Sequence, residues 1–179
     1  FQAEDGIRDF CLSRGLGDVY KRQDYRLMNI DLNSSKDGKN LSQDQIFDFI
    51  KKNFNFIGDL KKDLRINDRT FACKGNTKDF IWFSYKDFFR QNLAISDFLA
   101  ICEKYNWFFI DDFEQNDDYG KDIIRRFIGF IDIAYIEKVK IKFFFNSDDI
   151  RSLYIGEELS FLWDRTISRL EEMQNINDK

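Results

Sequence analysis

The chain has 179 residues, of which 43% are hydrophobic, a length and composition that suit one domain with its own core. It contains no histidine, which excludes a Ser-His-Asp triad, a Cys-His pair and any zinc or haem site that needs a histidine from this chain. The net charge of −4 does not favour nucleic acid as a partner. The three cysteines lack CxxC spacing, which argues against a metal knuckle or a disulfide framework and indicates a reducing compartment.

The first 23 residues differ in composition from the rest of the chain. They hold three of the nine glycines and lack the bias toward Phe, Ile, Asn and Lys that marks the other residues. This segment resembles a translated sequencing-adapter peptide, so we expect residues 1–23 to be disordered and to contribute nothing to function. Its Gly15-Leu16-Gly17 is weak evidence for a phosphate loop, because no strand precedes it and no GK[ST] comes after it.

Residues 24–58 are predicted to form a strand or coil, a polar loop and an amphipathic helix. Ser42 is placed to cap that helix, and Gln45, at its third position, completes a capping box. Four apolar residues share one face of it: Ile46, Phe49, Ile50 and Phe54. Gly58 is expected to end or follow this helix.

Residues 59–104 are predicted to form hairpins and then a helix. Between 59 and 85, short apolar strands are separated by Asn67-Asp68 and by residues 74–78, which are connections of hairpin length with turn-forming residues. Ser96 is expected to cap a helix over residues 97–104.

The stretch from Trp107 to Phe145 predicts strand, helix and strand. An apolar run at 107–110 precedes a helical pattern at 117–137, and a second apolar strand is expected at 139–145. A βαβ unit of this kind is parallel and needs a sheet to join. A last helix is expected at 157–174 with one apolar face: Leu159, Trp163, Ile167, Leu170 and Met173. The prediction is therefore an α/β fold with a partial parallel sheet and a βαβ unit, a small antiparallel hairpin region and a C-terminal helix.

Two patterns allow a functional and a structural interpretation, and we favour the structural one for both. Asp111-Asp112 ends an apolar strand as the acids of a Walker B strand do, but the sequence has no GxxxxGK[ST] to accompany it. Six aromatic residues could stack on single-stranded nucleic acid if exposed: Phe80, Trp82, Phe83, Trp107, Phe108 and Phe109. In a chain with 21 phenylalanines, core packing is the stronger expectation.

Four arginines could contact an anion. Arg125 and Arg126 come after Asp122 on the expected 117–137 helix, so they could form local ion pairs or reach a phosphate, even across a subunit interface. Arg165 and Arg169 are four residues apart and project on one side of the last helix. They suit carboxylate or phosphate binding and equally suit a solvated face, where Glu172 is placed to pair with Arg169.

Two strings carry a resemblance to a known family. RRFIGFIDIAYIEKVKIKFFFNS at 125–147 and FLWDRTISRLEEMQ at 161–174 resemble the closing motifs of the ZapE-type (AFG-one-like) family of AAA+ ATPases. The residues that match are Arg126-Phe127-Ile128, Ile131-Asp132, Tyr135, Val139-Lys140, Arg165-Thr166, Ser168-Arg169-Leu170 and Glu172-Met173-Gln174. Asp24-Tyr25-Arg26 and Asp97-Phe98-Leu99 are similar to further family patterns.

The resemblance implies an ATP-hydrolysing parent protein that uses ATP and Mg²⁺. The Walker A loop, Walker B Asp-Glu and sensor strand of the family are absent from this sequence, so residues 24–179 look like the C-terminal portion of such an ATPase. We expect no catalytic residue, no metal site and no ATP hydrolysis in this chain alone. Arg126, Arg165 and Arg169 are the candidates for nucleotide sensing or for a subunit interface.

The same resemblance implies where the parent protein works and with what. It would be cytoplasmic, with a location peripheral to the inner membrane as an option, and oligomeric when intact. It would contact the rest of its own ATPase core and could act on division or membrane-associated proteins. No nucleic-acid partner is expected. The alternative from another class is a small non-enzymatic α/β protein-interaction module. The coding sequence upstream of Asp24 separates the two, because only the first requires a phosphate loop there.

Overall fold

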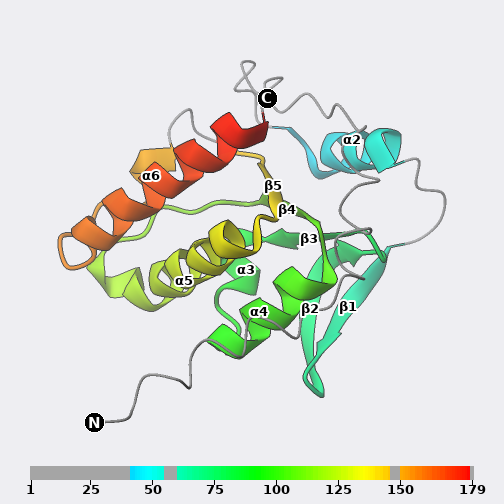
Figure 1. Ribbon diagram of the computed structural model, residues 1–179, viewed down its shortest axis with the longest axis horizontal. Coiled ribbons are helices and arrows are strands. Elements are labelled where there is room, and N and C mark those ends of the chain that lie inside the picture. Colours follow the sequence, from blue (N-terminus) through cyan, green and yellow to red (C-terminus); the bar gives the residue numbers. More distant parts are fainter. Residues whose placement is uncertain (1–40, 55–59, 146–149, 178–179) are drawn as a thin grey trace, which may run out of the picture. The chain divides into compact units, whose positions relative to one another are not determined.

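The computed structural model describes residues 41–54, 60–145 and 150–177, with no side-chain detail after residue 173 (Figure 1). All of them belong to one compact unit, Leu32–Lys179. The predictions for residues 1–23, for the strand or coil and loop that precede Leu41, and for Gly58 fall outside the described residues.

A single five-stranded mixed sheet organises the described residues. Its strands are arranged in chain order: β1 (Lys61–Ile66), β2 (Arg69–Asn76), β3 (Phe80–Ser84), β4 (Trp107–Asp111) and β5 (Lys140–Phe143). β1, β2 and β3 pair antiparallel, whereas β3, β4 and β5 pair parallel. The predicted α/β class, hairpins and βαβ unit are therefore confirmed, and β3 joins the two parts into one sheet. The first hairpin turns at Asn67-Asp68, both with positive φ, which these residues tolerate well. The second connection is shorter than the predicted 74–78, because β2 continues to Asn76 and the chain turns over residues 77–79.

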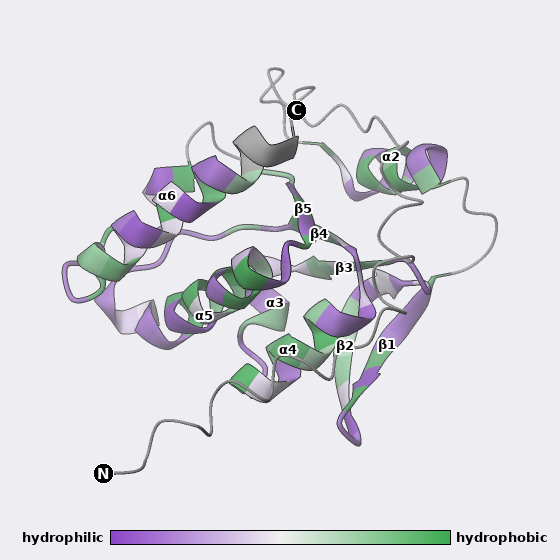
Figure 2. Cartoon of the chain, viewed as in Figure 1, coloured by the Kyte–Doolittle hydropathy of each residue, from purple (hydrophilic) through white to green (hydrophobic). Residues whose placement is uncertain are grey.

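Helix α5 (Lys121–Glu137) is the crossover between β4 and β5. It begins four residues later than predicted, because Asp118–Gly120 forms a 3₁₀ turn whose cap is the Asp117 carboxylate. The face of the sheet formed by Ile81, Phe83, Phe108 and Ile110 packs against α5 and against α4 (Ile95–Lys104). Figure 2 shows hydrophobic and hydrophilic residues mixed along both helices, as their amphipathic patterns require.

Helix α2 (Gln43–Phe54) covers the opposite face of the sheet. Its predicted capping box is confirmed: the Ser42 N–H donates to Gln45 Oε1 (2.8 Å), and the Gln45 N–H donates to Ser42 Oγ (3.3 Å). The ring of Phe54 lies 5.0 Å from that of Phe80 and 5.7 Å from that of Trp107, between centroids. All six aromatic residues that could have stacked on nucleic acid are buried, so their interpretation as core is confirmed and the exposed platform is wrong.

The predicted cap of α4 by Ser96 is wrong. The helix begins at Ile95, and Asp97 supplies the acceptor from its third position: Asp97 Oδ2 accepts the Ala94 N–H at 2.8 Å. The same oxygen lies 2.6 Å from Arg69 Nη1 on β2, and the Asp97 side chain is almost fully buried. The Asp97 carboxylate both caps the helix and pairs with Arg69 of the sheet, whereas the Ser96 hydroxyl could only have capped the helix. The start of α4 is therefore set by Asp97.

The last helix, α6 (Ser160–Asn177), buries Trp163, Ile167 and Leu170 of the predicted apolar face, and Met173 packs partly buried against the core. Leu159 of that face is buried just before the helix begins. It begins three residues later than predicted, after the 3₁₀ turn Ile150–Leu153. Across the described ranges, no helix combines the length and apolar character needed to cross a membrane.

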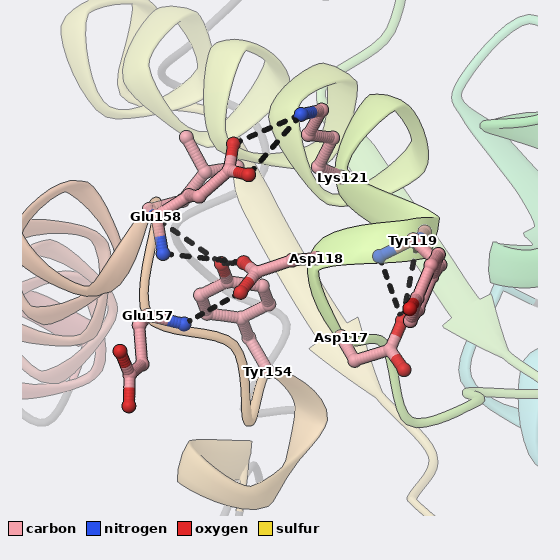
Figure 3. Close-up of polar contacts among 9 residues, drawn as sticks. Asp117, Asp118, Tyr119, Lys121, Tyr154, Glu157 and Glu158 are labelled. Carbon is pink, nitrogen blue, oxygen red and sulfur yellow. Dashed lines mark hydrogen bonds and ion pairs between the residues drawn. The ribbon is translucent and has the colours of Figure 1, made fainter.

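Polar contacts around Asp118 fix the start of α6 against the start of α5 (Figure 3). The Asp118 carboxylate accepts the Tyr154 hydroxyl and the backbone N–H groups of Glu157 (3.1 Å) and Glu158 (3.2 Å). The Tyr154 oxygen in turn accepts the Leu159 N–H at 3.0 Å. These donors, led by the Tyr154 hydroxyl, lower the pKa of Asp118. We call this group of contacts the Asp118 knot.

Replacing Asp97 tests the buried cap. Asp97→Ala should lower the free energy of unfolding by about 2–3 kcal/mol, because two charge-assisted hydrogen bonds are lost and a partly exposed Arg69 is left unpaired. Urea denaturation of the purified chain measures this. The control is Arg65→Ala, whose ion pair with Asp68 is exposed and should cost at most about 1 kcal/mol. Equal losses in the two variants would contradict the assigned role of Asp97.

The Asp118 knot predicts a pH-dependent stability difference. A carboxyl whose pKa is lowered on folding stabilises the fold above its ordinary pKa of 3.8, and this contribution is lost as the pH falls through the lowered value. Asp118→Asn should therefore be less stable than the unmutated chain at neutral pH, and the difference should shrink below about pH 4. Thermal melts across pH measure it. Asp122→Asn, at an exposed position on the same end of α5, should show little difference at any pH.

Candidate functional site

Two arginines of α6 converge on one carboxylate of α5. Arg165 Nη2 lies 2.7 Å from Asp132 Oδ2, and Arg169 Nη1 contacts Asp132 Oδ1. Asp132 therefore holds both guanidinium groups, one on each oxygen. We call these three residues the arginine clamp. It brings together two of the three candidate arginines.

A second polar pair extends the clamp along the same side of the two helices. The Tyr135 hydroxyl donates to Glu172 Oε2 at 2.7 Å, and the Arg169 guanidinium carbon lies 5.5 Å from the centre of the Tyr135 ring. The hydrogen bond to Glu172 raises the pKa of Tyr135. Glu172, placed by its spacing to pair with Arg169, thus binds Tyr135 instead, and Arg169 pairs with Asp132.

The helical periods of α5 and α6 create this arrangement. Arg165 and Arg169 are four residues apart and lie beside the buried face of α6, where Thr166 is fully buried with its hydroxyl bonded to the Leu162 carbonyl at 2.9 Å. Asp132 and Tyr135 are three residues apart and share one side of α5. Sequence reasoning did not select these two as site residues. Both stand in the matched string, on one helix face, which was the available signal.

The clamp has hydrogen-bonding capacity to spare. Each guanidinium offers five N–H donors, and a single carboxylate cannot use the donors of two. Arg165 is exposed and Arg169 half-buried, so an oxyanion could approach from solvent. The clamp alone carries a net charge of +1, but Glu172 beside it brings the group to zero. A bound phosphate or carboxylate would therefore be held by directed hydrogen bonds more than by net charge.

Arg126 lies elsewhere. Its Nη1 donates to the Phe89 carbonyl at 3.1 Å, which places it against the end of α3 (Tyr85–Phe88) and not on the side of α5 that faces α6. Arg125 is exposed, and among the described residues neither arginine forms an ion pair with Asp122. The structure thus separates Arg126 from Arg165 and Arg169.

The acids that end β4 bind a lysine. Lys74 Nζ lies 2.7 Å from Asp111 Oδ2 and 2.6 Å from Asp112 Oδ2, and it also lies over the Trp82 ring. Burial raises the pKa of Asp111, and the hydrogen bond from Lys74 opposes this shift. The ammonium group takes the place that a metal ion between these carboxylates would need. Within the described ranges no group of three acidic, cysteine or histidine side chains is assembled that could hold a metal ion.

Comparison with known proteins adds one positive finding. A family model described as AFG1-like ATPase matches residues 18–178, which include both strings that form the clamp. Comparisons with curated proteins and with solved structures gave no match. The family match covers most of the sequence and confirms the resemblance to ZapE-type AAA+ ATPases. The chain belongs to the AFG1-like ATPase family.

Proposed function

We propose that this chain works as part of an ATP-hydrolysing AAA+ protein, in which Arg165 and Arg169 sense bound nucleotide or contact a neighbouring subunit. The observation that carries the proposal is the arginine clamp: two guanidinium groups with unused donors are oriented by one carboxylate, at a solvent-accessible position. The rest of the ATPase core would supply the phosphate-binding loop and the ligands for Mg²⁺, since Lys74 is already paired with both acids at the end of β4.

The chemistry of the clamp suits a phosphate group. ATP supplies a terminal phosphoryl group whose oxygens gain charge stabilisation from arginine during transfer. A guanidinium presents its donors in a fixed plane, so its orientation decides whether it can bind two oxygens at once. In this chain Asp132 sets that orientation for both arginines, and Tyr135 supports Arg169 from its ring face. Arg126 is a separate candidate at another surface.

We also propose the wider setting that the family resemblance suggests. The intact protein would be cytoplasmic or peripheral to the inner membrane, would assemble as an oligomer, and would act on cell-division or membrane-associated proteins.

The rival proposal, a non-enzymatic interaction module, is disfavoured by the match to an ATPase family model. Genomic sequence upstream of the Asp24 codon tests this choice. A GxxxxGK[ST] in frame supports the ATPase, and a start codon at or near Asp24 contradicts it.

Arginine variants of the intact ATPase test the role of the clamp. Arg165→Ala and Arg169→Ala should each lower kcat for magnesium-dependent ATP hydrolysis, by up to about 10³-fold where the arginine stabilises the transferring phosphoryl group. Arg125→Ala, which removes an exposed arginine from the polar side of α5, is the matched control and should keep kcat. The 179-residue chain alone should show no hydrolysis.

A purely structural role for the clamp predicts a different result. Asp132→Asn would then lower the thermal stability together with Arg165→Ala and Arg169→Ala, and each folded variant would retain the unmutated kcat. Thermal melts measured on the same preparations as the kinetics distinguish loss of fold from loss of chemistry.

A further inference from the structure

We propose that the N-terminal end of α6 carries a docking notch for a basic peptide segment of a partner protein, one that inserts an apolar side chain. The notch is a cavity of about 230 Å³ whose walls include Arg151, Tyr154, Gly156, Ser160, Trp163 and Asp164. None of the three residues of the arginine clamp lines it.

Exposed apolar side chains flank this cavity. Ile155 is 61% exposed and lies between two residues of the wall, and Phe161, 80% exposed, comes directly after Ser160 of the wall. Inside, the Trp163 indole N–H is already used by the Arg151 carbonyl, at 3.2 Å, so its ring contributes apolar surface. Large apolar groups exposed beside a cavity are typical of protein interaction sites.

The cavity size favours a peptide side chain as occupant. Small-molecule sites have volumes of about 300–1,000 Å³, larger than this notch. A single aliphatic or aromatic side chain requires less space, and Ile155 and Phe161 then remain available to contact its neighbours. The expected partner is therefore a polypeptide that contributes one anchoring residue to the notch.

Charge at the rim indicates a basic partner. Nearby cations are already paired: Arg151 with Glu171, Lys121 with Glu158 at 2.9 Å, and Arg165 with Asp132 at 2.7 Å. The carboxylates of Asp164 and Glu157, in contrast, have no ion pair with any residue that the structure describes. Figure 3 shows the Glu157 side chain pointing away from Asp118. Unpaired acids beside an apolar cavity attract lysine or arginine next to the anchor, and they repel anionic membrane surfaces.

The notch is held in shape by the Asp118 knot. Asp118 accepts the N–H groups of Glu157 and Glu158 at one wall, and Tyr154 both lines the cavity and binds Asp118. Gly156 fits only because it lacks a side chain, since a Cβ there would overlap Asp118 Oδ1 and the Tyr154 hydroxyl. A preformed wall reduces the ordering cost of binding a peptide.

Fluorescence anisotropy with two labelled probes tests the proposal on the full 179-residue chain. The probes are the peptides GKKLFKKG and GEELFEEG, which share their apolar centre. The basic probe should bind at least about tenfold more tightly than the acidic one, and this preference should weaken with salt. Phe161→Ser and Ile155→Ser should each weaken binding of the basic probe about tenfold. Asp164→Lys should reduce the preference for the basic probe.

Ile136→Ser provides the matched control, because Ile136 is 69% exposed but lies on α5 near its C-terminal end. It should leave probe affinity unchanged. Equal affinity for the two probes, no measurable binding of the basic probe, or an equal loss with Ile136→Ser would overturn the proposal. So would self-association of the chain that Phe161→Ser abolishes, since the occupant would then be a second copy. All the substituted side chains are exposed, and circular dichroism verifies folding.

Discussion

The aromatic contact between α5 and the parallel strands determines where the functional side chains lie. Phe130 of α5 packs its ring 6.0 Å from that of Phe83 on β3 and 5.4 Å from that of Phe108 on β4, between centroids. Burial of such side chains is worth about 1.5–3 kcal/mol each, more than an exposed ion pair typically contributes. Once this face of α5 is fixed to the sheet, the side of the helix with Asp132 and Tyr135 must face away from it. Helix α6 packs against that side of α5.

Helix α6 is attached by two kinds of contact with different roles. Trp163, Ile167 and Leu170 supply most of the energy because they are buried, but apolar contacts allow a helix to slide or rotate by small amounts. The arginine clamp and the Asp118 knot require specific atoms to meet, at two places along the helix. They therefore fix the register of α6 on α5 more than they stabilise it, and register is what places the arginine donors and the notch.

Local rules predicted much of the fold. The capping box of α2, the hairpin at Asn67-Asp68 and the βαβ unit depend on residues close in sequence, and each was confirmed.

The Ser96 cap was wrong because Asp97 has a second partner, Arg69, 28 residues away, which no local pattern reveals. The partner of Arg165 and Arg169 was missed for the same reason: Asp132 lies on another helix. Lys74 likewise meets Asp111 from another strand, 37 residues away along the chain. Periodicity indicates which face of a helix is buried, and only the fold determines which charged residues meet.

Helix α6 presents opposite chemistry on neighbouring sides. Asp164 and Arg165 are adjacent in sequence, about 100° apart around the helix axis, so one lines the notch while the other binds Asp132. On the positive side, Arg165 is paired with Asp132 of α5. On the negative side, Asp164 and the nearby Glu157 have no ion pair with any residue that the structure describes. The notch therefore keeps a negative potential that attracts a cationic partner, although Arg165 is close to it, because Asp132 neutralises part of the Arg165 charge. Removal of Asp132 would leave the Arg165 charge uncompensated close to the notch. The clamp thus contributes to the negative charge of the notch through electrostatics, in addition to fixing the register of α6.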